Sequence, residues 1–191
     1  MTPHKDAVDR ASEWIVRWSH LVRAGGSVLD VACGSGRHLR WFHERNHAVC
    51  GVDIAPAAID SIADLGRAVL ADIENGPWPF AGETFDAVVV THYLWRPRLP
   101  DIVAAVAPGG VLLYETFAAG NETVGKPSRP DFLLKPGELL AACDGLQVVA
   151  YENGWLDAPP RFVQRIAAVR PPAGPLENPA RHPLRAPPPN Q

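Results

Sequence analysis

The chain alternates short, continuous apolar runs with segments long enough to form a helix, and this alternation restricts its fold more than any other feature. Two of the runs, AVVV at 87–90 and VLLY at 111–114, lack the polar alternation of a strand with one exposed face. Apolar strands that are separated by helices are typical of a parallel sheet covered on both faces. The sequence therefore predicts an α/β fold with a doubly wound, mostly parallel sheet.

The predicted sheet has seven strands. They are expected at Ser27–Ala32, Ala48–Ile54, Ala68–Asp72, Phe85–Val90, Gly110–Phe117, Leu146–Tyr151 and Arg161–Val169. Helices are expected at Ala7–Arg23, Ser35–Asn46, Pro56–Gly66, Leu99–Val106 and Pro136–Cys143. The last two strands are joined by Glu152–Pro160 without a helix, which favours a hairpin. The last strand is therefore expected to run antiparallel and to close the sheet.

The length and the distribution of proline predict one domain and a tail. A chain of 191 residues is typical of one domain, which we place at 1–170, with its N-terminal helix at about 7–23. Eight of the 20 prolines fall in residues 171–191. Because proline is excluded from helix interiors and inner strands, we expect an extended, flexible tail there. Residues 118–135 form a long segment without periodicity after the fifth strand, which is typical of a functional loop.

Composition excludes several classes of partner. The net charge is −3, whereas phosphate-binding proteins usually carry a clustered basic excess, so nucleic acid is disfavoured. The longest nearly uncharged stretches, 87–94 and 103–113, are shorter than the ~20 residues of a membrane span. The N-terminus lacks the apolar run of a secretory signal. Three widely spaced cysteines, Cys33, Cys50 and Cys143, predict reduced thiols, no metal site and a cytoplasmic location.

A glycine-rich turn, Cys33-Gly34-Ser35-Gly36, joins the first strand to the next helix. Glycine lets a ligand approach the backbone, and a helix N-terminus presents free N–H groups. The dinucleotide motif G-x-G-x-x-G requires glycine at position 39, where the chain has Leu39, and no Lys-Ser/Thr follows Gly36 as in a P-loop. The turn is therefore predicted to hold a nucleoside-like ligand of another kind.

Three carboxylates lie at the ends of the first three strands: Asp30, Asp53 and Asp72. They would repel a pyrophosphate, but they suit a ligand that carries cationic groups, a ribose diol and an exocyclic amine.

These features resemble the class I S-adenosylmethionine-dependent methyltransferases, whose sheet is Rossmann-like. The family's acidic residue and glycine turn match Asp30 to Gly36, with Ala32 in place of the usual first glycine, and Ala107-Pro108-Gly109-Gly110 matches the turn before the fifth strand. The resemblance covers about 27–169 and implies S-adenosylmethionine as the cofactor. It implies that Asp53 takes the ribose, Ile54 packs on the adenine, and Asp72 with Ile73 reads the adenine edge. The full set of cofactor-binding candidates is Asp30, Ala32, Cys33, Gly34, Gly36, Asp53, Ile54, Asp72, Ile73 and Thr91.

Two longer segments resemble one particular subgroup of this family. The stretches from His92 to Pro97 and from Tyr114 to Phe132 are similar to a bacterial subgroup related to the tellurite-resistance methyltransferases. That similarity does not name an acceptor.

The residues after the fourth and fifth strands are the acceptor-side candidates. His92 is the candidate general base or acceptor-orienting donor, because the Asn/Asp-Pro-Pro-aromatic motif that serves amino methylation in some families is absent there. Cys33 is predicted to be a small residue that fits the turn and not a nucleophile, since no activating base is evident. Glu115 needs a partner if it is buried; we expect Arg96, Lys126, Arg129 or the acceptor itself. The substrate-binding candidates are Tyr93, Arg96, Tyr114, Glu115, Asn121 and Arg129.

The predicted function is methyl transfer from S-adenosylmethionine to a small acceptor, with a thiol, a chalcogen oxyanion or a similar soft nucleophile favoured. Such an acceptor needs little proton abstraction, which agrees with the absence of a strong acid/base pair. Two alternatives stay open. An RNA or protein methyltransferase requires a basic surface near His92, and a non-catalytic cofactor-binding module requires an acceptor side that is plugged by side chains.

Overall fold

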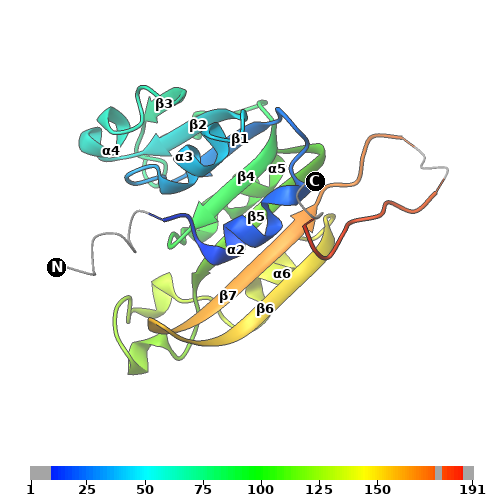
Figure 1. The fold of residues 1–191 in the computed structure, drawn as a ribbon. Helices are drawn as coiled ribbons and strands as arrows, with labels where there is room; N and C mark the ends of the chain where they lie inside the picture. Colours follow the sequence, from blue (N-terminus) through cyan, green and yellow to red (C-terminus); the bar gives the residue numbers. More distant parts are fainter. Residues whose placement is uncertain (1–9, 175–177, 187–191) are drawn as a thin grey trace.

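A seven-stranded sheet forms the centre of the computed structural model, which describes residues 10–174 and 178–186 (Figure 1). The strand order is β3-β2-β1-β4-β5-β7-β6. Neighbours from β3 to β5 are parallel, and β7 is antiparallel to both β5 and β6. The predicted α/β, Rossmann-like sheet with an antiparallel last strand is confirmed. The strands are β1 Ser27–Val31, β2 Ala48–Asp53, β3 Arg67–Leu70, β4 Phe85–Thr91, β5 Val106–Phe117, β6 Gln147–Asp157 and β7 Pro160–Val169.

The reversed strand lies inside the sheet and not at its edge. The chain crosses from β5 to the edge strand β6 and returns as β7 between the two. The register sets Glu115 of β5 directly opposite Arg165 of β7. The expectation that the last strand closes the sheet is wrong, because β7 is almost fully buried and replaces β6 as the partner of β5.

Helices cover both faces of the sheet. On one face lie α2 (Glu13–Trp18), α3 (Arg37–His43) and α4 (Pro56–Asp60), and on the other lie α5 (Leu99–Ala104) and α6 (Glu138–Ala142). Figure 1 shows α2 in front of β5 and β7, with α5 and α6 behind the sheet. The two faces carry separate apolar cores. Short 3-10 helices are η1 Ser19–Leu21, η2 Arg96–Arg98, η3 Asn121–Thr123 and η4 Pro130–Phe132.

The N-terminal helix is shorter than predicted. A helix was expected over Ala7–Arg23, but α2 begins after Ser12, whose hydroxyl accepts a hydrogen bond from the Trp14 N–H and caps the helix. The chain then continues as η1; residues 7–9 of the expected helix lie outside the described part. Trp14 and Trp18 are fully buried against the sheet, so this short helix is held by packing and not by its length.

Several element boundaries also differ from the expectations. β6 extends to Asp157, so most of the expected Glu152–Pro160 connection is strand and only residues 158 and 159 form the turn. The predicted helix Ser35–Asn46 is reduced to α3, because Gly36 and Asn46 adopt positive φ angles at its two ends. The polar residues at the end of β6 have a sequence typical of a loop. Pairing with β7 across the hairpin keeps them extended.

Residues 118–135 are organised without a long helix or strand. They contain η3 and η4, and a single bridge between Ala118 and Leu134 brings their two ends together beside the end of β5. The described part of the tail, 171–174 and 178–186, has no helix or strand, and the carbonyl of Pro183 lies 2.9 Å from Nε2 of His20. In the described ranges, none of the helices has the length and apolarity to cross a bilayer.

Candidate functional site: a glycine loop and the carboxyl ends of β1, β2 and β4

The glycine loop turns sharply between β1 and α3. Ala32, Gly34 and Gly36 all have positive φ angles, at 54°, 53° and 78°. A Cβ on Gly36 would lie 2.2 Å from Cγ2 of Ile62, whereas a Cβ on Gly34 would meet nothing within 4 Å. Gly36 is therefore required for packing, and Gly34 leaves open space at the carboxyl end of β1, where a ligand can reach the backbone.

Replacing Ala32 with Gly is expected to stabilise the protein. An L-residue in the left-handed region is strained, and glycine relieves that strain at a smaller entropic cost, so the free energy of unfolding should rise by about 1 kcal/mol. Chemical denaturation measures the change. The control is Ala57→Gly on the exposed side of α4, which should lower stability by about 0.5 kcal/mol. Equal losses in both variants would refute the assigned strain.

Asp30 is a buried carboxylate without a hydrogen-bond donor. Its side chain is 1% exposed, and neither oxygen has a hydrogen-bond partner among the described residues. The nearest basic group is Nδ1 of His38, 3.5 Å from Oδ2. The Ser12 N–H donates to Nε2 of His38, which leaves the ring proton on Nδ1. His38 thus faces Asp30 through a long contact that makes no hydrogen bond, and a buried carboxylate that is so weakly paired is costly.

Asp53 ends β2 and faces the glycine loop. Its Oδ2 accepts the Gly34 N–H at 2.9 Å, and its Oδ1 accepts the Ala55 N–H at 2.9 Å. Each carboxylate oxygen accepts more than one hydrogen bond, so both oxygens keep capacity for ribose hydroxyls. Ile54, the next residue, is 63% exposed. A large apolar side chain beside this carboxylate offers a surface for a planar base.

Asp72 and Ile73 lie two and three residues beyond the end of β3. Asp72 accepts the backbone N–H groups of Glu74 and Asn75 and the Asn75 side-chain amide. The side-chain hydrogen bond from Asn75, first among these contacts, lowers the pKa of Asp72. The side chain of Ile73 is buried in the core on the α5 side, and its carbonyl accepts from Arg98. These contacts form a local turn that already uses the Asp72 carboxylate. This structural role is the alternative to a role of Asp72 in binding the adenine.

All three cysteines are free and buried. Burial, followed by the negative charges of Asp30 and Asp53, raises the pKa of Cys33. Burial also raises the pKa of Cys50 to about 11 and that of Cys143 to about 12. A protonated thiol is a poor nucleophile, so the environment of Cys33 agrees with its predicted role as a small residue in the turn.

His92 follows β4 at the carboxyl edge of the sheet. It has a φ of 55°, and its N–H donates to the Glu115 carbonyl, which continues the pairing of Thr91 with Glu115. Its ring stacks on Phe117 with 5.0 Å between ring centroids. Desolvation, followed by the positive charge of Arg37, lowers the pKa of His92 to about 4. Part of the residue is exposed at the edge of the site while the ring stacks on Phe117, and the lowered pKa leaves His92 neutral at pH 7 and able to accept a proton.

The two tyrosines proposed for the acceptor side point elsewhere. Tyr114 is 1% exposed in the core on the α5 and α6 side, and its hydroxyl donates to the Tyr93 carbonyl. The Tyr93 side chain packs against that same core. Because side chains alternate along a strand, Tyr114 and Glu115 lie on opposite faces of β5. The structure thus does not bring the tyrosines together with Glu115.

Glu115 is buried on the α2 side and is paired. Its Oε2 lies 3.3 Å from Nη1 of Arg165, and its Oε1 accepts from the hydroxyl of Ser12 at 3.0 Å. The expectation that Glu115 pairs with Arg96, Lys126 or Arg129 is wrong, because the insertion of β7 beside β5 sets Arg165 directly opposite.

The polar residues of the 118–135 segment hold its shape. Arg96 donates to both carboxylate oxygens of Glu138 and to the carbonyls of Asp131 and Leu133. Asn121 is buried, donates to the Pro127 carbonyl and accepts the Phe162 N–H. Arg129 is exposed and pairs with Asp131 at 2.8 Å. These contacts connect residues 118–135 to η2, α6 and β7. They use the polar groups of Arg96, Asn121 and Arg129, which the sequence had suggested for binding an acceptor.

Four residues near the site were missed by the sequence analysis: Ser12, Arg37, His38 and Arg161. Ser12 and His38 link α2 and α3 to the buried carboxylates described above. Arg37 is the first residue of α3, and Arg161 is near the start of β7. Arg37 follows the glycine turn directly in the sequence, and this position could have identified it as a residue of the site. Nothing in the sequence indicates that Arg161 returns to this edge, because its position depends on the strand order.

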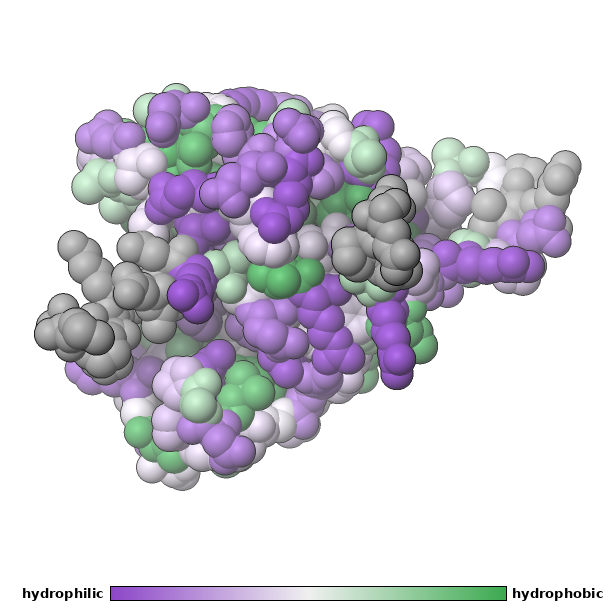
Figure 2. Space-filling view, in the orientation of Figure 1, coloured by the Kyte–Doolittle hydropathy of each residue, from purple (hydrophilic) through white to green (hydrophobic). Residues whose placement is uncertain are grey.

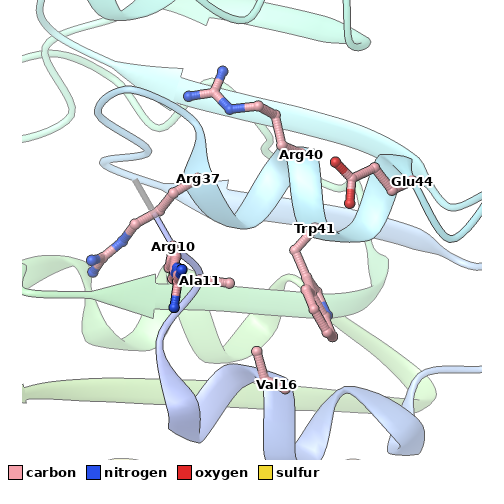
Figure 3. A pocket seen from close by; sticks show the side chains of 7 residues that line it. All are labelled: Arg10, Ala11, Val16, Arg37, Arg40, Trp41 and Glu44. Atoms are coloured by element: carbon pink, nitrogen blue, oxygen red, sulfur yellow. The ribbon is translucent and has the colours of Figure 1, made fainter. Parts of the chain in front are cut away.

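Arg37 also lines a pocket between α2 and α3. The pocket has a volume of about 330 Å³, and Figure 3 shows Arg37 extending toward the start of α2 and away from Arg40. Figure 2 shows a largely hydrophilic face with a small hydrophobic patch at the place of α2. No residue from the carboxyl ends of β1, β2 or β4 lines the pocket, so it lies beside the glycine-loop site. Its lining residues are Arg10, Ala11, Val16, Arg37, Arg40, Trp41 and Glu44.

Comparison with known proteins agrees with this geometry. Residues 28–110 match the sequence family described as "Methyltransferase domain". Malonyl-[acyl-carrier protein] O-methyltransferase from Serratia marcescens is 36% identical over 106 residues, which cover 51% of this chain and 40% of that protein. The chain thus spans less than half the length of this relative.

Two solved structures show the same fold. TehB from Haemophilus influenzae has a TM-score of 0.63 and 21% identity, over 87% of this chain and 62% of that one. An S-adenosylmethionine-dependent methyltransferase from Mesorhizobium loti has a TM-score of 0.64 and 19% identity, over 85% of this chain and all of that one. The similarity to TehB covers more of the chain than the matched sequence family does.

Residues 28–110 match a methyltransferase-domain family, and the fold is shared with S-adenosylmethionine-dependent methyltransferases, so the chain is similar to this class. The predicted resemblance to that class, which includes tellurite-resistance-type proteins, is confirmed. The cofactor of the class is S-adenosylmethionine, as predicted.

Proposed function

We propose that this chain binds S-adenosylmethionine at the carboxyl ends of β1 and β2 and transfers its methyl group to a small acceptor beside His92. A thiol, a chalcogen oxyanion or another soft nucleophile is favoured. The proposed catalytic domain is 1–170, residues 118–135 border the acceptor, and residues 171–191 form a Pro-rich, flexible tail.

The observation that carries this proposal is the buried, unpaired carboxylate of Asp30 beside the open backbone of Gly34. A bound amino-acid ammonium group would supply the missing donor to Asp30. Asp53 has the geometry to accept from a ribose diol while it keeps the Gly34 amide, and Ile54 offers its exposed face to the adenine. The residues present therefore fit the cofactor of the class. Asp72 and Ile73 remain candidates for the adenine edge.

When bound, the cofactor supplies an electrophilic methyl carbon next to a positively charged sulfur. Asp30, Asp53 and Ile54 would hold the cofactor, and its methyl group would pass to an acceptor beside His92. The protein contributes alignment and exclusion of water. His92 is neutral at pH 7 because its surroundings lower its pKa, so it can take a proton from an acceptor that has one, although only as a weak base. An acceptor that arrives without a proton needs no such help.

The macromolecular alternative receives less support. A phosphate-binding surface needs unpaired cations. Arg96, Arg98 and Arg129 are held in ion pairs with Glu138, Asp101 and Asp131, so the basic surface that this alternative requires is left to residues without an ion pair in the described part of the chain: Arg37, Lys126, Lys135 and Arg161. The non-catalytic alternative requires a blocked acceptor side, whereas His92 is exposed there.

The first test measures cofactor binding. Calorimetry with S-adenosylhomocysteine should detect binding to the wild-type protein, and Asp53→Ala should weaken it about ten-fold or more, because the ribose loses a charged hydrogen-bond acceptor. The matched control is Asp60→Ala on the exposed end of α4, which should bind normally. Normal affinity in Asp53→Ala would refute the ribose assignment, and no binding by the wild-type protein would refute the proposed function.

A further inference from the structure

His38 lies between a buried carboxylate of the proposed cofactor site and the residue that caps α2. The residue is 1% exposed. On one side of the ring, Nδ1 lies 3.5 Å from Oδ2 of Asp30. On the other side, Nε2 accepts the backbone N–H of Ser12, the N-cap of α2, at 3.2 Å. One imidazole ring therefore contacts both the end of β1 and the start of α2.

Two contacts to other elements hold Ser12 at the start of α2. The His38 ring accepts its backbone N–H, and Oε1 of Glu115 accepts from its hydroxyl at 3.0 Å. The same hydroxyl accepts the Trp14 N–H and so caps the helix. Because α2 has six residues, it is too short to be stable without such contacts. The His38 ring is thus one of the groups that fix the first turn of α2.

Only a neutral ring with its proton on Nδ1 suits both sides of His38. A neutral imidazole has one donor and one acceptor nitrogen, whereas a protonated imidazole has two donors. Because Nε2 accepts from Ser12, the neutral ring presents its N–H to Asp30. Protonation would set two N–H groups against each other at Ser12 and would give Asp30 a charged partner. The protonated ring therefore serves Asp30 at the expense of α2.

The charged groups around His38 come from five neighbouring parts of the fold. They are Asp30 on β1, Arg37 on α3, His92 after β4, Glu115 on β5 and Arg165 on β7. Glu115 and Arg165 form an ion pair with each other. The positive charge of Arg37 opposes protonation of His38, and the carboxylate of Asp30 favours it. A positive ligand group that offsets Asp30 therefore favours the neutral ring, which holds α2.

We propose that His38 is a positioning residue that couples the cofactor site to α2, so that cofactor binding at Asp30 and fixation of the first turn of α2 stabilise each other. This inference rests on the proposed function and goes beyond it. His38 faces Oδ2 of Asp30, and Oδ1 has no hydrogen-bond partner in the part of the chain that the structure describes. Oδ1 is therefore left for an ammonium group. Because coupling between two sites is reciprocal, a fixed first turn of α2 also raises cofactor affinity.

The first test compares the free protein with protein saturated with S-adenosylhomocysteine. Hydrogen exchange of the Ser12 and Trp14 amides, followed by NMR, should slow about five-fold or more in the complex, because the first turn of α2 opens less often. The ring nitrogens of His38 report its protonation between pH 5 and 8, the range about which histidine titrates. Protonation should require a lower pH in the complex than in the free protein, so affinity should fall as the pH is lowered.

Two substitutions separate the two contacts of the ring. His38→Gln can place an amide oxygen near the position of Nε2, so it keeps an acceptor for Ser12 but cannot be protonated. It should retain slow exchange at Ser12 and lose the pH dependence of affinity. His38→Asn can place an N–H near the position of Nδ1, but it is too short to reach Ser12. It should lose the protection of Ser12 and bind S-adenosylhomocysteine about five-fold more weakly.

Two further variants test the route and the specificity of the coupling. Asp30→Asn removes the charge that links the ligand to His38, so saturating S-adenosylhomocysteine should no longer slow exchange at Ser12. His43→Asn changes an exposed histidine at the end of the same helix, and it is the matched control. This variant should show the exchange, the pH dependence and the affinity of the wild type.

Several results would overturn the inference. They are equal exchange at Ser12 with and without S-adenosylhomocysteine, the same protonation range of His38 in both states, and wild-type affinity in a folded His38→Asn variant. If His38→Asn does not fold, the measurements on the wild-type protein and on His38→Gln decide. If S-adenosylhomocysteine binds without these effects, only the coupling is refuted. If it does not bind at all, the proposed function fails and this inference fails with it.

Discussion

Replacing Asp30 with Asn is expected to stabilise the free protein and to weaken cofactor binding at the same time. The carboxylate is buried without a donor, so a neutral amide of the same size removes an unpaired charge, and the free energy of unfolding should rise by about 1–2 kcal/mol. The ammonium group of the cofactor loses its charged partner, and affinity for S-adenosylhomocysteine should fall about ten- to a hundred-fold. A gain in stability together with a loss of cofactor affinity would identify Asp30 as a carboxylate that serves binding.

Chemical denaturation and calorimetry measure the two effects. Asp64→Asn on an exposed turn is the control, and both quantities should change little there. A loss of stability in Asp30→Asn together with unchanged affinity would mean that Asp30 serves the fold through His38 and not the cofactor.

Glu115→Ala is expected to cause a large loss of stability. The carboxylate is 1% exposed and contacts Arg165, which is 8% exposed. Removing one partner of a buried ion pair typically costs about 3 kcal/mol, because the remaining charge stays out of water. Arg165 keeps Glu152 at 2.6 Å, which places the expected loss at the lower end of the range. The variant also removes the acceptor of the Ser12 hydroxyl and so loosens the start of α2.

Denaturant unfolding of three variants checks this assignment. Asp131→Ala, which removes the exposed pair with Arg129, should change stability by less than about 1 kcal/mol. The double variant Glu115→Leu with Arg165→Leu should be more stable than Glu115→Ala, since an apolar pair leaves no uncompensated charge. A Glu115→Ala variant as stable as Asp131→Ala would show that the buried pair contributes little.

The strands were well predicted because their signal is local. Continuous apolar runs such as 87–90 and 111–114 are required by a sheet covered on both faces, and they occur as β4 and β5. The helices were predicted too long, because their short lengths are set by the positive φ angles at Gly36 and Asn46 and by packing of Trp14 and Trp18. Packing of that kind has no signature within a short window of sequence.

The sequence by itself determined the strand–helix alternation, the glycine loop and the carboxylates at the strand ends, which are the residues of the proposed cofactor site. Each depends on residues close together in the chain. The tertiary structure decided the partners at the end of β5. Returning β7 between β5 and β6 pairs Glu115 with Arg165. These two residues are 50 positions apart in the chain, and their pairing follows from strand order, which local patterns of polarity do not encode.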